Sequence, residues 1–573
     1  MRYIALCIPL IIASMAFALV TGAEARTLPD QSPASSGLSR RGNTVSVPGA
    51  NNFVVGSIFG EPPKTRHYNF VVSEMKGAPD GFTKNMLVVN GLFPGPTIEA
   101  NQGDRLVVHV TNHMSNRTTI HWHGIPQNGT NYYDGTAAVT ECGIPPGQSL
   151  TYDFSLDTFS GTTWWHPNGL WYLVDTQYTD GIEGALIVHP RSYPRKFPTW
   201  DEDLVVELAD VYHTFSTTIA SQILFGGGTL NPLQLEVSDS GAINGIGQYN
   251  GSTRYFDFDL KPNKTYRLRL INEGSAAQIR FSIDYHALTV IEADNTLTEP
   301  YTVSDLTLGV AQRYSVLITT NQTAEPEGNY WMRAGLINET FVAGVNTDIR
   351  GIIRYGNSKS TPTTSTDPGV PGSGLSDLNP ALLAPAIATT LPDSTKFYNV
   401  NFTVGPRTGG GTIATMNGTS WEPLSGTSTL LQILEAAKKG QTFAPEGPSL
   451  ELGNQLIITE NSIQVVDLLL VNVGFGIHPF HLHGHMPYIL GFGNGTYDGT
   501  GLNTVNPIAR DTYEVPSNGW LLARFVTDNP GIWTIHCHIA WHMQAGLLMQ
   551  INSLPSKSAK FNIPPAILSQ CGV

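Results

Sequence analysis

Residues 531–542 read GIWTIHCHIAWH, and this stretch decides how the rest of the chain is interpreted. Alternate side chains of a β-strand point the same way, so a strand here presents His536 and His538 together. These two histidines flank Cys537 directly. Imidazole is a usual ligand of copper, zinc and iron, and an added thiolate favours copper. The stretch therefore predicts a β-strand that carries metal ligands.

Similar motifs occur at both ends of the chain. His121-Trp-His123-Gly matches His481-Leu-His483-Gly, and GTTWWHPN (161–168) corresponds to GIWTIHCH (531–538). Duplication of a β-domain explains this internal repeat. The first copy departs from the second at one point, since Asn168 stands where the second copy has a histidine.

Nine of the sixteen histidines fall into four tight groups: HWH (121–123), His166, HPFHLH (478–483) and HCHIAWH (536–542). Lone histidines are more often hydrogen-bonded structural residues, and this reading covers the isolated ones, including His189, His213 and His286. A structural, hydrogen-bonding role does not explain four histidine clusters in one chain.

One cysteine with two histidines and a weak axial neighbour forms a blue-copper electron-transfer site. Cys537, His542 and His478 supply that set, and Leu547, ten residues beyond the cysteine, cannot act as a ligand. If His536 and His538 bind further copper ions, an electron passes from Cys537 to them through a few bonds. This arrangement indicates one-electron oxidation at one site and dioxygen reduction, which needs four electrons, at another.

Composition favours an all-β protein. The 573 residues include 58 Gly and 38 Pro with only 14% charged residues, which is typical of many short strands joined by turns. The formal charge of -14 argues against nucleic acid and anionic membranes as partners.

The N-terminus predicts export. Residues 1–25 combine Arg2, an apolar run and an A-x-A cleavage site, which together indicate a secretory signal peptide. Arg40-Arg41 is a weak signal for removal of a short pro-segment. We expect a secreted, extracellular glycoprotein, because nine Asn-x-Ser/Thr sequons follow, at Asn116, Asn128, Asn250, Asn263, Asn321, Asn338, Asn401, Asn417 and Asn494.

Three cysteines remain after removal of the signal peptide, an odd number in an oxidising compartment. Cys537, between two histidines, is the one assigned to metal. Cys142 and Cys571 then pair and close a long loop, which constrains the unfolded chain.

Short alternating strand patterns recur throughout, whereas the best helical stretch is Leu430–Lys439. We expect Greek-key sandwiches or barrels. The predicted organisation is a signal peptide at 1–25, domains at 65–190, 200–355 and 396–555, a Ser/Thr/Pro/Gly-rich linker at 356–395 and a tail at 556–573.

The motifs HWHGIPQNGTNYYDG, GTTWWH, LADVYH, INGIGQY, HPFHLHGH and HCHIAWHMQAGL resemble those of the multicopper oxidases, and within them the fungal, ascomycete-type laccases. The resemblance runs from about residue 65 to the C-terminus. It implies three cupredoxin-like domains and four copper ions. It also implies a small phenolic or aromatic substrate with O2, and a monomer.

By position, the resemblance implies a type 1 copper, a type 2 copper and a pair of type 3 coppers. Their ligands would be His478, Cys537 and His542 for type 1, His121 and His481 for type 2, and for the type 3 pair His123, His166 and His538 on one copper with His483 and His536 on the other. Asp210 aligns with a carboxylate that accepts a phenol proton, and Asp134 with an acid that delivers protons to the oxygen site; a hydrogen-bonding or turn role is the alternative for both. The family also often joins cysteines that match Cys142 and Cys571.

The chain departs from the family at residues 167–174. The family usually reads WYHSH there, whereas this chain reads WWHPNGLWYLV, with Asn168 in place of a copper-binding histidine. Three accounts remain: the segment is a gene-model error, the second type 3 copper has only His483 and His536, or Asn168 or water completes the site weakly. A missing ligand of this kind weakens copper loading and oxygen reduction.

Three functions follow from these motifs. The first is a laccase-like oxidase that couples one-electron oxidation of phenols to reduction of O2 to water. The second is a metal oxidase of the ferroxidase type, which needs acidic residues around the type 1 histidines. The third is a type 1 copper electron-transfer protein with an impaired oxygen site.

Overall fold

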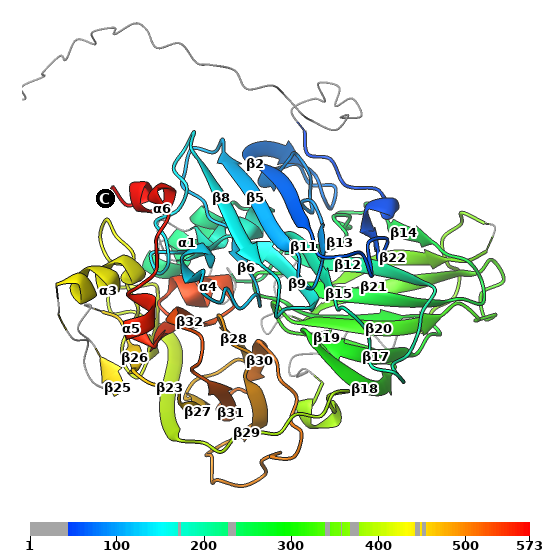
Figure 1. Ribbon diagram of the computed structural model, residues 1–573. Helices are drawn as coiled ribbons and strands as arrows, with labels where there is room; N and C mark the ends of the chain where they lie inside the picture. Colours follow the sequence, from blue (N-terminus) through cyan, green and yellow to red (C-terminus); the bar gives the residue numbers. More distant parts are fainter. Residues whose placement is uncertain are drawn as a thin grey trace, which may run out of the picture. The chain divides into compact units, whose positions relative to one another are not determined.

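Six large β-sheets, arranged in three consecutive pairs, form the described part of the chain (Figure 1). The structure, a computed structural model, describes residues 44–169, 174–226, 236–337, 344–356, 358–366, 378–439, 441, 447–449 and 454–572. Within these ranges no helix has the length and apolar character needed to cross a bilayer.

The first pair of sheets holds the first group of histidines. One sheet has the strand order β3-β2-β5-β8 and the other β4-β11-β9-β6, and a short parallel pair joins β7 to β10. The strands are β2 (Thr65–Gly77), β3 (Lys84–Val89), β4 (Ile98–Asn101), β5 (Arg105–Asn112), β6 (His121–Trp122), β7 (Thr136–Ala137), β8 (Ser149–Ser155), β9 (Gly161–His166), β10 (Asn168–Gly169) and β11 (Gly184–His189).

The second pair of sheets lies between the two histidine-rich regions in the sequence. One sheet runs β1-β12-β15-β20-β17-β18, with β13 beside β12, and the other runs β14-β22-β21-β16-β19. The strands are β1 (Val54–Val55), β12 (Glu202–Val211), β13 (Ser240–Ile243), β14 (Phe256–Asp259), β15 (Thr265–Asn272), β16 (Gln278–Ile283), β17 (Leu288–Ala293), β18 (Thr296–Val303), β19 (Asp305–Leu308), β20 (Arg313–Thr319), β21 (Asn329–Ile337) and β22 (Asp348–Arg354).

The third pair of sheets holds the remaining histidine groups. Its sheets run β24-β23-β27-β31-β29 and β25-β26-β33-β32-β28-β30. The strands are β23 (Lys396–Pro406), β24 (Thr412–Met416), β25 (Gly447–Ser449), β26 (Ile457–Glu460), β27 (Val465–Asn472), β28 (His478–Leu482), β29 (Tyr488–Asn494), β30 (Thr512–Val515), β31 (Gly519–Val526), β32 (Gly531–Cys537) and β33 (Leu548–Ser553).

Helices are short and lie between strands or at the C-terminus. They are η1 (Ala50–Phe53), η2 (Asn131–Tyr133), η3 (Asp175–Asp180), α1 (Ser216–Phe225), η4 (Pro380–Leu382), α3 (Thr429–Lys438), α4 (Ala540–Gln544), α5 (Pro555–Ser558) and α6 (Pro565–Gln570).

The all-β expectation of three cupredoxin-like domains is confirmed, and α3 forms where the helical pattern was expected. The exact domain and linker boundaries stay predictions. The pairing of β1 was not predicted from the sequence. This strand pairs with β12 of the second domain, which begins well over a hundred residues later in the chain. The signal peptide, Arg40-Arg41, Asn338 and the central part of the 356–395 linker lie outside the described residues.

Strand register explains how histidines reach the domain surface while their neighbours stay in the core. In the first domain His121 pairs with His166, and Trp122 pairs with Trp165, across β6 and β9. Both tryptophans belong to the hydrophobic core of that domain and are fully buried. Because side chains alternate between faces, the two histidines point away from that core.

The third domain repeats this pairing of histidines, with Cys537 at the position that corresponds to Pro167. Phe480 pairs with Cys537, and His481 pairs with His536, across β28 and β32. Phe480 and Cys537 lie in the hydrophobic core. His481 and His536 therefore face the opposite side of the sheet.

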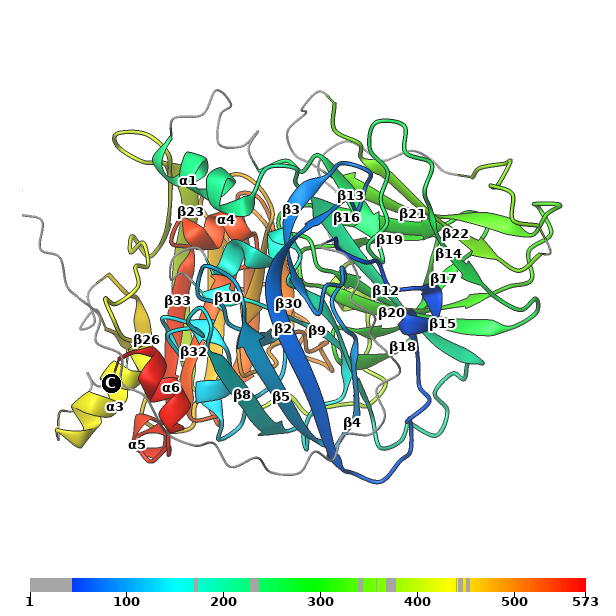
Figure 2. The ribbon, with the colours of Figure 1, turned by 90° about the horizontal axis from the view of Figure 1, so that it is seen from above.

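The C-terminus is attached to the first domain. Cys142 and Cys571 form a disulfide across 429 residues of sequence, which confirms the pairing expected from the cysteine count. Ile567 of α6 packs into the core of the first domain, and α6 lies beside β8 in both views (Figures 1 and 2).

We expect Trp165→Ala to destabilise the first domain strongly. The indole packs against Phe70 with ring centroids 4.7 Å apart and donates a hydrogen bond to the carbonyl of Pro96. Truncation of a buried aromatic side chain costs about 3–5 kcal/mol, which calorimetry measures as a lowered transition temperature. Phe397→Ala, at an exposed position of β23, is the control, and an equal shift in both variants would contradict the assigned core role.

Candidate metal centre

Three side chains of the third domain form the first cluster, which we call the thiolate cluster: His478, Cys537 and His542. The sulfur of Cys537 lies 3.6 Å from Nδ1 of His478 and 3.7 Å from Nδ1 of His542, and the two nitrogens are 3.1 Å apart. Cys537 comes from β32, His478 from β28 and His542 from α4. One soft and two nitrogen donors that face one point are the donor set of a blue-copper site.

Seven further histidines meet where the first and third domains face each other, and we call them the imidazole cluster. They are His121, His123, His166, His481, His483, His536 and His538. The rings of His123 and His481 stack with centroids 3.8 Å apart, and those of His121 and His483 lie 4.1 Å apart. The structure therefore brings together all ten side chains that the sequence assigned to metal, in two adjacent clusters.

In six of the seven imidazoles, a protein oxygen holds one ring nitrogen so that the other faces the cluster. His121 donates from Nδ1 to the Asp134 carbonyl at 2.7 Å, and His481 donates from Nδ1 to the Asp511 carbonyl at 2.8 Å. The same pattern holds for His166 with Pro167 O, His536 with Cys537 O, His483 with Asp134 Oδ2 and His123 with Asp511 Oδ1. Such partners fix the tautomer and orientation of a metal-binding histidine.

The nitrogens that face the cluster suit metal ions. Nε2 of His121, Nε2 of His481 and both ring nitrogens of His538 are buried and have no hydrogen-bond partner among the described residues. Burial lowers the pKa of His538 to about 3 and that of His483 to about 4. These two imidazoles are therefore neutral at ordinary pH, which is the form that binds metal.

Asp134 lies directly behind the imidazole cluster. Its Oδ2 accepts hydrogen bonds from Nδ1 of His483 at 2.9 Å and from the Thr136 hydroxyl at 2.8 Å. Burial raises the pKa of this carboxyl, but the adjacent His483 and His121 outweigh burial and hold the pKa below its ordinary value. Asp134 is therefore an anion that orients a histidine.

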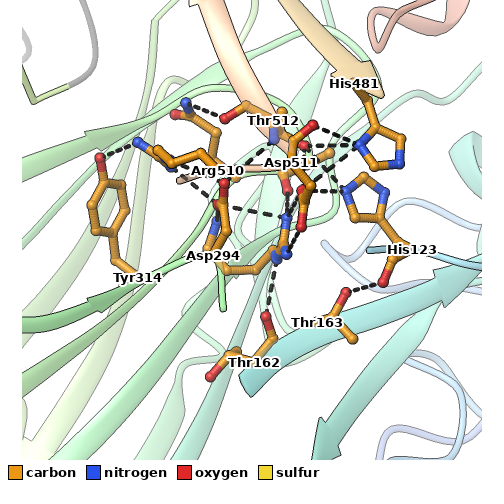
Figure 3. A network of polar contacts seen from close by, with 12 residues as sticks. His123, Thr162, Thr163, Asp294, Tyr314, His481, Arg510, Asp511 and Thr512 are labelled. Carbon is orange, nitrogen blue, oxygen red and sulfur yellow. Dashed lines mark hydrogen bonds and ion pairs between the residues drawn. The ribbon is translucent and has the colours of Figure 1, made fainter. Parts of the chain in front are cut away.

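A buried ion-pair network joins the imidazole cluster to the second domain (Figure 3). Arg313 of β20 forms two hydrogen bonds, of 2.6 and 2.5 Å, to the carboxylate of Asp511, and donates from Nε to the Thr162 carbonyl of β9. Asp511 in turn accepts a hydrogen bond from Nε2 of His123 at 3.1 Å. One guanidinium therefore links all three domains and supports the residue that orients His123, whose Nδ1 is left to face His166 at 3.5 Å.

The environment of Asp210 fits the hydrogen-bonding role, one of the two roles that the sequence left open. Its carboxylate accepts three backbone N–H groups, from Ser275, Ala276 and Ala277, at 2.8–2.9 Å. Burial raises its pKa, although these hydrogen bonds oppose the shift. The geometry shows a carboxylate that fixes the 275–277 loop, and its role toward substrate stays a prediction.

Glu236 is a site residue that sequence reasoning missed. Its carboxylate lies 3.4 Å from Nε2 of His542, and both side chains are partly accessible, with exposed fractions of 14% and 9%. No spacing in the sequence connects residue 236 with residue 542, so only the fold reveals this contact. The isolated histidines behave as expected: His189 contacts Glu99, and His213 contacts Asp80.

Comparisons with known proteins identify the class. Three family models, all described as multicopper oxidase, match residues 71–193, 202–358 and 424–557. A laccase from Agaricus bisporus, Laccase-2, is 34% identical over 506 residues, which cover 86% of this chain and 90% of the relative. The chain therefore belongs to the multicopper oxidase family, and copper is its cofactor.

Solved structures give the same result. The laccase from Botrytis aclada superposes with a TM-score of 0.76 and 31% identity, covering 89% of this chain and 92% of the other. Fet3p, described as a multicopper oxidase that functions in iron import, superposes with a TM-score of 0.77 and 25% identity, covering 89% and 94%. The chain is thus a laccase-like multicopper oxidase and an oxidoreductase.

We expect Asp511→Asn to destabilise the copper-free protein by up to about 3–5 kcal/mol, because buried Arg313 loses the carboxylate that accepts two of its hydrogen bonds and keeps only the longer ion pair to Asp294 at 3.5 Å. Calorimetry of the copper-free variant gives the change in transition temperature. Bound copper measured after dialysis should fall as well, because His123 loses the carboxylate that orients it.

Asp153→Asn is the matched control. Asp153 forms a two-point ion pair with Arg105 at the protein surface, at 2.6 and 2.5 Å. Solvent screens such a pair, so this variant should keep the parent transition temperature and copper content. Equal behaviour of the two variants would contradict the role given to Asp511.

Proposed function

We propose that this protein oxidises phenolic or related aromatic substrates one electron at a time at the thiolate cluster and reduces O2 to water at the imidazole cluster. One observation carries the proposal: Cys537 belongs to the first cluster, while its two covalent neighbours belong to the second. Both clusters are therefore joined by a path of a few covalent bonds.

The hydrogen-bond pattern supports a division of the clusters among three kinds of copper site. His478, Cys537 and His542 would hold a type 1 copper, and His121 with His481 would hold a type 2 copper through their Nε2 atoms. The type 3 pair would use His123, His166 and His538 on one ion and His483 with His536 on the other. When bound, the copper ions supply one-electron redox chemistry and the site of O2 binding.

The substrate end of the thiolate cluster is His542. This histidine is more exposed than His478, and the Glu236 carboxylate lies beside its outer nitrogen. A phenol loses a proton when it loses an electron, so a carboxylate next to the electron-accepting imidazole favours that oxidation. We assign the role of proton acceptor to Glu236, since Asp210 is already engaged by three backbone donors.

Asp134 would act at the imidazole cluster, where O2 would be reduced. It contacts His483 and lies 3.5 Å from Nδ1 of His121, so it is within reach of the groups that surround O2. An anionic carboxylate in this position can accept hydrogen bonds from proton-carrying groups and so direct protons toward the O2 that is reduced to water.

The exposure of the sequon asparagines supports secretion as a glycoprotein. The asparagines of the eight sequons within the described residues are all exposed: Asn116, Asn128, Asn250, Asn263, Asn321, Asn401, Asn417 and Asn494. A glycan needs such exposure. We propose an extracellular monomer with the Cys142–Cys571 disulfide formed.

Metal oxidation is the second candidate. Glu236 beside His542 is also where a cation would bind, and Fet3p, one of the structural neighbours, is described as functioning in iron import. The third candidate, electron transfer without oxygen reduction, predicts a type 1 site alone.

Purified protein should contain type 1 copper with a blue colour and a type 1 EPR signal, and should consume O2 when a phenol is added. Cys537→Ser should lose the colour, the EPR signal and the oxidation of phenol, because it removes the thiolate. Rapid oxidation of Fe²⁺ with little activity on phenols would instead favour the metal oxidase, and blue colour without O2 uptake would favour electron transfer.

We expect Glu236→Gln to lower kcat/KM for a phenol by about tenfold or more, because the amide cannot accept the proton. An electron donor that releases no proton should be oxidised at the parent rate. Glu99→Gln, which makes the same change beside the remote imidazole of His189 at 2.7 Å, is the control. An equal loss with both donors would contradict the proton-acceptor role.

A further inference from the structure

Asn168 occupies the position in the imidazole cluster where a third imidazole would stand. Nε2 of His483 and Nε2 of His536 lie 3.1 Å apart, and the side-chain amide of Asn168 lies 3.5 Å from each of them. Its side chain is fully buried, and its Oδ1 has no hydrogen-bond partner among the described residues. The three groups form a closed triangle around one point.

The backbone holds Asn168 in this place. Its N–H donates to the Thr119 hydroxyl at 3.2 Å, and its carbonyl accepts from that hydroxyl at 3.1 Å. The next residue, Gly169, has a φ of +114°, and its Cα lies so close to the Ala137 backbone that no side chain fits there. Asn168 is therefore a fixed part of the wall of the cluster.

The chemistry of the amide determines which atom can serve as a ligand. His483 and His536 each donate from Nδ1 to a protein oxygen, so both Nε2 atoms are lone-pair donors. An amide NH2 group has no free lone pair and can only give hydrogen bonds to them, whereas the amide oxygen has two lone pairs. A half-turn about the Cβ–Cγ bond exchanges the two ends and brings Oδ1 to the same point.

Asn168, His483 and His536 form one half of the imidazole cluster. The other half, formed by His123, His166 and His538, contains imidazoles only. His123 Nδ1 and His166 Nε2 lie 3.5 Å apart, with the ring of His538 centred 5.2 and 5.1 Å from theirs. Replacement of one imidazole by a carboxamide in the half that holds Asn168 therefore makes the two halves chemically unequal.

We propose that Asn168 is a metal ligand, which binds copper through Oδ1 beside Nε2 of His483 and Nε2 of His536. This inference rests on the proposed oxidase function and specifies one half of its oxygen site. Copper prefers imidazole to a neutral carbonyl oxygen, so this half-site binds copper more weakly than the half-site of His123, His166 and His538. Of the two type 3 half-sites, it is the first to lose metal when free copper is lowered.

The test is a copper titration of purified, metal-depleted protein in buffers of graded free copper, with bound copper, visible absorption and EPR as readouts. Asn168→Ala should weaken binding of the copper ion held by His483 and His536 by about tenfold or more, since it removes the third ligand. Asn168→Asp, which has the same shape but an anionic oxygen, should retain or tighten that copper. Asn168→His should tighten it because imidazole is the better ligand.

Asn329→Ala is the matched control, because Asn329 is equally buried in β21 of the second domain, where its amide donates to the carbonyl of Ser360 at 3.0 Å. It should leave every copper affinity unchanged. Equal titrations of the parent and of Asn168→Ala would overturn the assignment of Asn168. The type 1 EPR signal reports the thiolate cluster separately, so its absence from the parent protein would count against the proposed function instead.

Discussion

The alternation of side chains along two pairs of β-strands is the constraint on which the site depends. On β32 it turns Cys537 toward the core of the third domain and His536 toward the first domain. On β9 it buries Trp165 in the core of the first domain and turns His166 toward the third. Neighbouring residues thus belong to separate clusters without any irregular backbone, and a shift of one residue in either register would exchange core and ligands.

Burial and hydrogen bonding act together on the imidazoles. Burial lowers the pKa of His538 and His483 well below neutrality and keeps both rings uncharged. The protein oxygens that accept one N–H from each ring decide which nitrogen is left for metal. Arg313 of the second domain has two roles. It fixes the Asp511 carboxylate that orients His123, and it contacts the backbone of β9 in the first domain. Architecture and metal geometry therefore depend on the same buried ion pair.

The sequence predicted the features that follow local rules. His-x-His spacing fixed which histidines share a face, and the odd cysteine count separated Cys537 from the disulfide. The sequence did not predict features that depend on how distant loops fold. Glu236 reaches His542 only through the tertiary structure, and Asp210 is engaged by the 275–277 loop, whose path the sequence does not specify. The pairing of β1 with β12 likewise depends on a long-range contact.

The imidazoles of the imidazole cluster come from residues 121–166 of the first domain and 481–538 of the third, and the last covalent link to the first domain is made by Cys571. Domains of a nascent chain fold in order from the N-terminus. The thiolate cluster is complete once the third domain folds, whereas the imidazole cluster also requires that domain to dock on the first. Biosynthesis therefore completes the imidazole cluster last, and a copper ion that arrives before docking meets only the ligands of one domain.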